Sequence, residues 1–374
     1  MSRRLIRIML FSLIMISTVF SQDQTESVLI QQIKDYMKSA HQKGFSGAVL
    51  VARSGKILLS RGYGMAIREQ VVPNTNQTAY LIGSITKQFT AAAILKLQMM
   101  GKLNVQDRIG KYFKKVPRDK RKITIHQLLT HTSGLAEVIG DDFEPISRDE
   151  FIRRALSSKL RHKPGKQYEY SNVGYSLLGA IIEIVSQKSY EIFLNEELLR
   201  PAKILMTGYR VPRWGPEDLA HGYKENQDWG TILDKPSAED GPYWNLRANG
   251  GLLSTVTDLY QWHKALKDDR ILSEEAKKLY YAPHVKEGPE ADTFYGYGWV
   301  VATTPRNTKV VAHNGGNGIF SADFRRYLDE DVVIIVCSNI AGQKAWQIAE
   351  QIDRILFAAP LDSLAKPAEN SSRD

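Results

Sequence analysis

The chain has 374 residues, which at roughly 150 residues per domain predicts two domains or one large composite domain. Hydrophobic residues make up 43% and charged residues 24%, as in an ordinary globular protein, so a wholly disordered, collagenous or coiled-coil chain is excluded. The formal net charge is +9, but the basic residues are dispersed and accompany no nucleic-acid-binding motif, so we expect no nucleic-acid partner.

The first 21 residues have the pattern of a secretory signal peptide. Three arginines stand near the start, a mostly apolar run covers residues 8–20, and Ser21 would precede cleavage at Gln22. The run is short for a bilayer, which needs about 20 apolar residues. We therefore expect an exported protein, periplasmic or secreted, with no stable membrane span after cleavage. An uncleaved membrane anchor is the alternative.

Periodicity then predicts the elements in chain order. A helix over 23–43 precedes a β-hairpin made of 47–51 and 57–63, and an apolar helix over 84–100 ends at Gly101. No period is visible over 209–244, and residues 361–374 are polar. The other predicted helices are 124–130, 148–157, 172–186, 190–199, 254–267 and 343–357, and the other predicted strands are 296–303, 309–313, 319–327 and 332–337.

This order predicts an α/β composite fold, in which N-terminal and C-terminal strands complete one antiparallel sheet flanked by helices. A helical domain would be inserted between the two halves of the sheet. The expected boundaries are 22–110 plus 245–360 for the α/β domain, 111–244 for the inserted domain and pocket loop, and 361–374 for a polar tail. The single cysteine, Cys337, lies in a predicted buried strand, where it would act as a small apolar residue.

A first candidate motif opens the apolar helix. Ser84 and Lys87 are three positions apart, so they would share one helix face. A serine at a helix N-terminus also exposes its own backbone N–H beside the positive end of the dipole. Nucleophile, base and one oxyanion donor would then lie together, provided that burial or nearby cations lower the lysine pKa. Alternatively, Ser84 caps the helix and Lys87 is a surface lysine.

Two further motifs support the catalytic interpretation. Tyr170 and Asn172 precede an apolar helix, where a phenol can relay protons and an amide can bind both a substrate carbonyl and a lysine. His313 ends a predicted strand and Gly315 and Gly316 follow it, and glycines there allow a ligand backbone to approach the strand edge. Taken alone, Asn172 is also a good helix cap, and the glycine-rich segment could be a simple hairpin.

Together, these motifs and their order resemble the serine penicillin-recognising family, which contains class C β-lactamases, DD-peptidases, D-aminopeptidases and related esterases. The resemblance covers most of residues 25–358 and includes the flanking segments 88–92, 128–135, 170–175 and 249–255. It implies a β-lactamase/transpeptidase-like fold and no metal or organic cofactor.

The resemblance also implies roles for individual residues. Ser84 matches the acylated nucleophile, Lys87 the lysine that activates it and Tyr170 the proton-relaying tyrosine. Asn172, His313 and Gly315 match substrate-binding positions, and the N–H groups of Ser84 and Gly316 match the oxyanion hole.

Two positions depart from the pattern of class C β-lactamases. His313 stands where most of those enzymes have lysine, and Asn314 stands where a hydroxyl residue is usual. Both His313 and the Tyr170–Asn172 segment are more similar to DD-peptidases and D-peptidases. His126 and His131 lack the spacing of a zinc-binding helix, so we expect both to be structural.

We therefore expect an exported serine hydrolase that acts through a Ser84 acyl-enzyme on amides or esters, with cell-wall-type D-amino-acid peptides as the leading substrate class. The alternatives are a β-lactamase, a carboxylesterase, or a penicillin-binding receptor that is acylated with little turnover. The expected partner is a small peptide, ester or β-lactam substrate.

Overall fold

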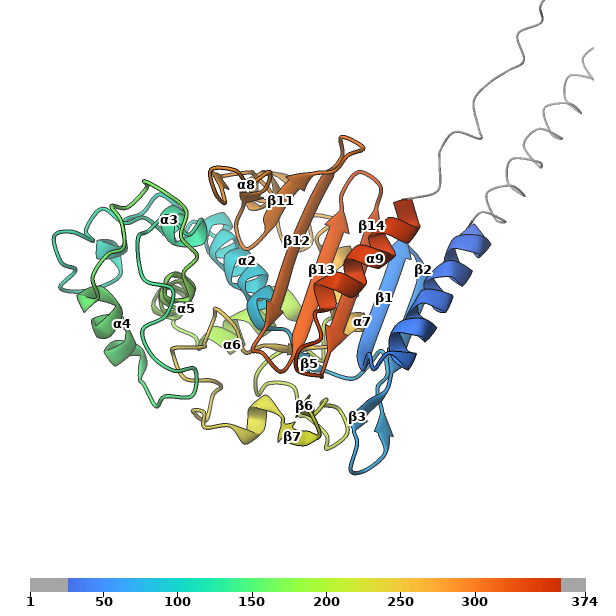
Figure 1. Ribbon diagram of the computed structural model, residues 1–374. Helices are drawn as coiled ribbons and strands as arrows, with labels where there is room; N and C mark the ends of the chain where they lie inside the picture. The colour runs from blue at the N-terminus through green and yellow to red at the C-terminus, as the bar shows by residue number, and fades with distance from the viewer. Residues whose placement is uncertain (1–25, 358–374) are drawn as a thin grey trace, which may run out of the picture.

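The computed structural model describes residues 26–357, so the predicted signal peptide and polar tail lie outside the described residues. An eight-stranded antiparallel sheet forms the centre of the molecule (Figure 1). Its spatial order is β2-β1-β14-β13-β12-β11-β10-β9. The bounds are β1 Gly47–Arg53, β2 Lys56–Tyr63, β9 Val285–Lys286, β10 Phe294–Tyr295, β11 Val300–Thr303, β12 Lys309–Gly316, β13 Ser321–Tyr327 and β14 Val332–Ser338.

Strands from the N-terminal and C-terminal parts of the described chain pair with each other near one edge of this sheet. Strand β1 pairs with β14 in antiparallel register from Gly47 opposite Ser338 to Arg53 opposite Val332. All seven residues of β14 are buried, Cys337 among them, which explains why this segment is a continuous apolar run. The predicted sheet, completed by strands from both ends of the sequence, is confirmed.

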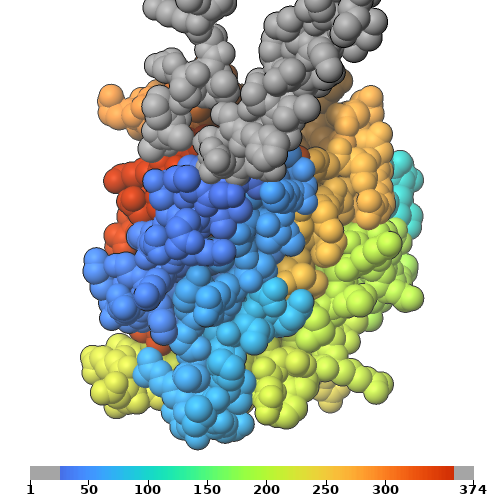
Figure 2. Space-filling view, turned by 90° about the vertical axis from the view of Figure 1, so that its right-hand side faces the viewer, coloured from blue at the N-terminus to red at the C-terminus, as the bar shows by residue number. Residues whose placement is uncertain are grey.

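Helices cover both faces of the sheet. A helix over residues 26–42 and helix α9 (Ala345–Phe357) lie on one face, where Ile33 and Ile352 belong to one apolar cluster with alternate residues of β1 and β14. Figure 2 shows this N-terminal helix, in dark blue, on the outside of the molecule. The opposite face packs on α2 (Thr86–Met99) and α7 (Val256–Ala265) in a larger apolar cluster.

Helix α2 lies between the sheet and a helical region on its far side (Figure 1). It is buried on nearly every side from Thr86 to Leu95, which fits its strongly apolar sequence. One apolar cluster includes residues of α2, of the sheet and of the helical region. The division of the chain into two domains therefore stays a prediction. The helical region contains α3 Ile125–Leu129, α4 Arg148–Ser157, α5 Asn172–Ser186, α6 Tyr190–Leu194 and a π-helical turn, Asn195–Leu199.

The structure differs from the predicted elements in several places. The predicted helix over 84–100 begins as a 3-10 turn, Gly83–Ile85, before α2 starts at Thr86. The stretch 209–244 contains a small hairpin. The sequence did not indicate it, because its strands are too short to show a period. The α-helix and strands that the sequence did not indicate are α8 Glu274–Tyr280, β3 Met65–Ile67, β4 Val72–Pro73, β5 Tyr80–Leu81, β6 Gly222–Lys224, β7 Gln227–Gly230, β8 Leu253–Ser254, β9 and β10.

Among residues 26–357, none of the helices has both the length and the apolar character that crossing a membrane requires.

Candidate active site

Ser84 lies in the tight turn between β5 and α2, directly against strand β12. Gly83 has φ +51°, and a Cβ built there would lie 2.2 Å from the backbone nitrogen of Gly316. A Cβ on Gly315 would lie 2.6 Å from the backbone nitrogen of Ser84. Two glycines therefore let the main chains of Ser84 and Gly316 approach, which is the arrangement that a two-donor oxyanion hole needs.

Lys87 places its amine one turn along from Ser84. The Nζ atom lies 3.0 Å from Ser84 Oγ, 2.7 Å from Asn172 Oδ1 and 2.7 Å from the backbone oxygen of Asn249. Both carbonyl oxygens only accept hydrogen bonds, so a neutral amine donates its two N–H groups to them. Its lone pair then faces the Ser84 hydroxyl, as a general base requires.

Burial makes this neutral form accessible. The Lys87 side chain has no solvent exposure, and this burial lowers its pKa well below the usual lysine value. The carboxylates of Glu137 and Asp142 oppose the shift, but desolvation is the larger effect. The alternative that Lys87 is a surface lysine is wrong. Ser84 likewise makes no side-chain cap to either helical segment.

Tyr170 covers the other side of the lysine. Lys87 Nζ lies 4.8 Å from the centre of the Tyr170 ring. Burial raises the pKa of the Tyr170 phenol, while an interaction with the Ser84 hydroxyl lowers it. Tyr170 is therefore a neutral phenol at pH 7 that contacts both members of the first motif, and it can pass a proton between them and a substrate.

Asn172 is the first residue of α5 and not its cap. Ser171 occupies the cap position, where its hydroxyl accepts from the Gly174 N–H at 3.0 Å. Because the serine satisfies the helix end, the Asn172 amide oxygen is left to accept from Lys87.

Asn249 is a contributor that the sequence did not reveal. Its side-chain nitrogen donates to Ser176 Oγ and to the backbone oxygen of Asn245, both at 2.8 Å. These bonds hold its own backbone carbonyl against Lys87. The segment 249–255 stood out in the sequence, but a role carried by a main-chain oxygen leaves no side-chain signal.

His313 is a neutral, buried imidazole in strand β12. Its Nδ1 lies 2.6 Å from the backbone oxygen of Asn314, and must donate because that oxygen only accepts. Its Nε2 then accepts from the Tyr295 hydroxyl at 2.9 Å. Burial, together with the nearby Lys87, lowers the His313 pKa to about 4. Both ring nitrogens are thus occupied, and the geometry favours a neutral polar group over an imidazolium that binds a carboxylate.

His131, which was expected to be structural, lies beside the site and supports the Tyr170 segment. Its backbone oxygen accepts from Glu169 N–H at 2.8 Å, and its Nδ1 accepts from Ser171 N–H at 3.0 Å. These two amides flank Tyr170, whose ring centre lies 4.3 Å from that of His131. His131 therefore holds the Tyr170 segment from both sides. It does so with a left-handed backbone, at φ +57°, a conformation that non-glycine residues seldom adopt.

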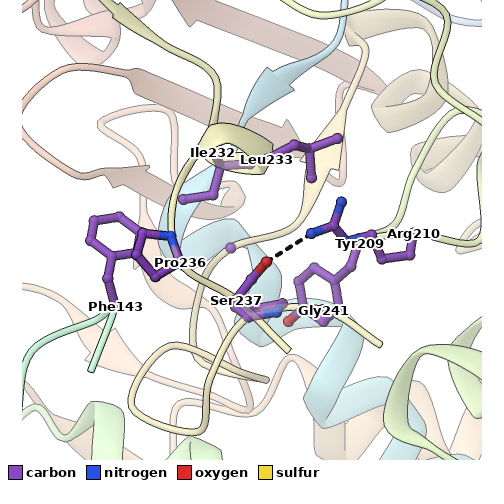
Figure 3. A pocket seen from close by; sticks show the side chains of 10 residues that line it. Phe143, Tyr209, Arg210, Ile232, Leu233, Pro236, Ser237 and Gly241 are labelled. Carbon is purple, nitrogen blue, oxygen red and sulfur yellow. Dashed lines mark hydrogen bonds between the residues drawn. The ribbon is translucent and has the colours of Figure 1, made fainter. Parts of the chain in front are cut away.

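A small pocket is lined mainly by residues of the stretch 209–244 (Figure 3). Phe143, Ile232 and Pro236 line it, and Arg210 donates to Ser237 Oγ at 2.7 Å across it. The space that a water-sized sphere can enter is only about 20 Å³, close to the need of one water molecule. In this conformation the pocket is too small to hold a substrate group larger than that.

One group of side chains among residues 26–357 has donor atoms close enough for a metal ion. Ligand atoms of Glu69, His221 and Asp228 all lie within 4.8 Å of one another. His221 already hydrogen-bonds Asp228 at 2.8 Å, and Glu69 accepts from the Tyr223 hydroxyl at 2.8 Å. None of these residues takes part in the site around Ser84.

Comparison with known proteins decides the family. The family model described as Beta-lactamase matches residues 29–355. The chain belongs to the Beta-lactamase family. This family has a serine penicillin-recognising, transpeptidase-like fold, and its members are serine hydrolases.

The chain is similar to several members of this family. It is 28% identical to Penicillin-binding protein 4* of Bacillus subtilis over 362 residues, which is 92% of this chain and 79% of that protein. It is 29% identical to Protein flp of Staphylococcus aureus over 341 residues, 86% of this chain and 66% of that protein. The structure of the octameric penicillin-binding protein homologue from Pyrococcus abyssi aligns with TM-score 0.76 and 28% identity, covering 88% and 77% of the two chains.

Proposed function

We propose that this protein is an exported serine hydrolase in which Ser84 forms an acyl-enzyme with amide or ester substrates. The observation that carries the proposal is the position of Lys87. Its buried amine contacts Ser84 Oγ while two carbonyl oxygens take its N–H groups. A lysine with a purely structural role has no need of a serine hydroxyl opposite its lone pair.

Acylation begins when Lys87, with Tyr170, takes the Ser84 proton as Oγ attacks the substrate carbonyl. The carbonyl oxygen becomes an oxyanion, to which the backbone N–H groups of Ser84 and Gly316 donate. When the tetrahedral intermediate collapses, the bond to the leaving group breaks and the proton passes from Lys87 or Tyr170 to the leaving nitrogen or oxygen. The acyl group remains on Ser84.

Deacylation repeats these steps with water. The same lysine and tyrosine take a proton from a water molecule as its oxygen attacks the acyl carbonyl, and the second collapse returns the proton to Ser84. No other nucleophile is required. The active site contains Asn172 and a neutral His313 as further polar groups for orienting a substrate.

We infer that D-amino-acid peptides of the cell-wall type are the leading substrate class. The support is the similarity to penicillin-binding proteins, because penicillins occupy sites that accept such peptides, together with the histidine at position 313. β-Lactamase and carboxylesterase activities are the alternatives within the same chemistry. An acylated receptor with little turnover is the alternative outside it.

One experiment separates these alternatives. Purified protein is labelled with a fluorescent penicillin, the free label is removed, and bound fluorescence is followed over time beside a hydrolysis screen of D-peptides, short esters and β-lactams. Rapid loss of label indicates a β-lactamase, and persistent label with D-peptide cleavage supports the proposal. Persistent label without turnover of any substrate indicates a receptor. Ester cleavage without labelling indicates an esterase. Ser84→Ala is the control and should acquire no label.

Export is tested separately. If residues 1–21 are a signal peptide, the mature protein recovered outside the cytoplasm begins at Gln22. Intact-mass analysis measures this directly. A mature protein that retains the leader contradicts cleavage, and recovery in the cytoplasm alone contradicts export.

A further inference from the structure

A second cavity lies at the opposite end of the sheet from Ser84. Its volume is about 690 Å³, within the range of small-ligand sites, and its walls come from α7, α8 and the adjoining ends of β12 and β13. Lys309, at the start of β12, lines the cavity, whereas Gly316, at the other end of that strand, contacts the nucleophile turn. Seven residues of extended strand separate the two positions by roughly 24 Å. The cavity is therefore distinct from the active site.

A buried arginine forms part of this cavity. The Arg326 side chain on β13 is only 2% exposed, and no carboxylate among residues 26–357 lies within 4.0 Å of its guanidinium. Buried charges are normally paired with a counter-ion, so this arginine is unusual.

The partners of Arg326 are all uncharged. Its Nε donates to His263 Nδ1 at 3.1 Å, one terminal nitrogen donates to the backbone oxygen of His263 at 3.5 Å and the other to the Tyr281 hydroxyl. These bonds use three of the five guanidinium N–H groups. His263 does not add a counter-charge, because burial and the adjacent Arg326 lower its pKa to about 2.

The cavity as a whole is positive. Lys267 pairs with Asp331 at 2.6 Å, and Lys277 pairs with Glu274 at 2.5 Å. These are the acidic residues of the lining, so their charges are already matched.

Two more lysines then remain alongside Arg326. Lys278 is exposed, and the Lys309 ammonium donates to the backbone oxygen of Tyr281 at 3.4 Å. Neither ammonium group lies within 4.0 Å of a carboxylate among residues 26–357, although Asp329 accepts from the backbone N–H of Lys309 at 2.6 Å. Three positively charged groups thus face one open cavity without an ion pair among the described residues.

We propose that this cavity binds a small organic anion, with a phosphate group between Arg326, Lys278 and Lys309 and an apolar body against the remaining walls. Phosphate oxygens match the planar guanidinium, and a dianion compensates more of the charge than a single carboxylate does. Leu266, Pro283 and Leu328 contribute the apolar walls. A free inorganic ion would leave most of the space unfilled.

Titration calorimetry with phenyl phosphate, at constant ionic strength, tests the proposal. We expect saturable binding with one site per chain, and at least a tenfold loss of affinity in the Lys278→Gln/Lys309→Gln variant. The matched control is Lys43→Gln/Lys344→Gln. These lysines line another cavity, of about 390 Å³, which has no arginine in its lining. The control should bind as the unmodified protein does.

Further probes separate the parts of the proposal. Benzyl alcohol, which has the ring but no charge, should not bind measurably, and inorganic phosphate should bind at least tenfold more weakly than phenyl phosphate. Arg326→Gln should abolish binding, provided that thermal unfolding shows this variant to be folded. If it is not folded, the comparison of the two double lysine variants tests the proposal.

Three results would overturn the proposal. Absence of saturable phenyl phosphate binding excludes the site. Equal losses in the two lysine pairs indicate diffuse attraction to a basic protein, and equal affinity for inorganic and phenyl phosphate excludes the apolar subsite.

Discussion

Replacing Gly315 by alanine tests the oxyanion hole without altering any reacting side chain. A Cβ at this position would lie 2.1 Å from the backbone oxygen of Ile82 and 2.6 Å from the backbone nitrogen of Ser84. Both neighbours are main-chain atoms, so strand β12 and the nucleophile turn must separate by more than 1 Å to reach ordinary contact distance. Loss of one oxyanion donor lowers kcat by roughly 100- to 1000-fold, about 2.7–4 kcal/mol of transition-state stabilisation. We expect a fall of this size.

The assay is kcat/KM on whichever substrate the screen identifies, measured beside thermal unfolding. Gly110→Ala is the matched control, because a Cβ at Gly110 meets nothing within 4 Å. It should keep full activity. A folded Gly315→Ala protein with unchanged kcat would show that the approach of β12 to Ser84 does not matter for catalysis. An equal loss in the control would show that the effect is not local.

The other predictions concern side chains around Lys87. Ser84→Ala should abolish turnover with little change in Tm, because this serine caps no helix, and a hydrolytically active variant refutes the nucleophile. Lys87→Ala and Tyr170→Phe should each slow acylation by about 100-fold or more, and the double mutant should be no slower than the slower of the two single mutants. If the two losses multiply in the double mutant, a shared proton path is contradicted. His131→Phe should lower kcat by about 100-fold with KM little changed. His131→Asn keeps a hydrogen-bond acceptor and tolerates positive φ, so it should retain much of the activity that His131→Phe loses. Equal effects on kcat and KM, or no difference between the two variants, would contradict a role of His131 in positioning Tyr170. Activity should not fall between pH 6 and 8, since the His313 pKa of about 4 leaves it neutral throughout; a decline that His313→Lys removes would contradict this.

The parts of the fold with a strong apolar pattern, continuous or periodic, were predictable from sequence. Strand β14 is apolar at nearly every position because both its faces are buried, and its pairing with β1 follows from the order of strands and helices. Helix α8 was missed because its seven residues are too few to show a helical period among its charged side chains. The hairpin within 209–244 was missed for the same reason, since its strands have three and four residues.

The candidate site was predictable where spacing fixes proximity. Ser84 and Lys87 are three positions apart, and the predicted contact between them is present at 3.0 Å. The contact of Lys87 with Asn172 spans 85 residues, so spacing could not show it; the chemistry of the amide suggested it and the resemblance to a known family supported it. The main-chain oxygen of Asn249 could not be inferred, because every residue has such an oxygen and only the folded chain places it.

The two buried histidines near Lys87 show what sets the pKa of this lysine. His131 and His313 both lie near Lys87, and burial lowers the pKa of each so that both are neutral. Had either been cationic, its charge would have held the lysine pKa down by repulsion, as cations do in other lysine bases. Here desolvation alone performs that role, and nearby carboxylates act against it. The basicity of Lys87 therefore depends on keeping water out of the site, and any substitution that admits water beside Lys87 should raise its pKa and slow acylation at neutral pH even if every catalytic residue is retained.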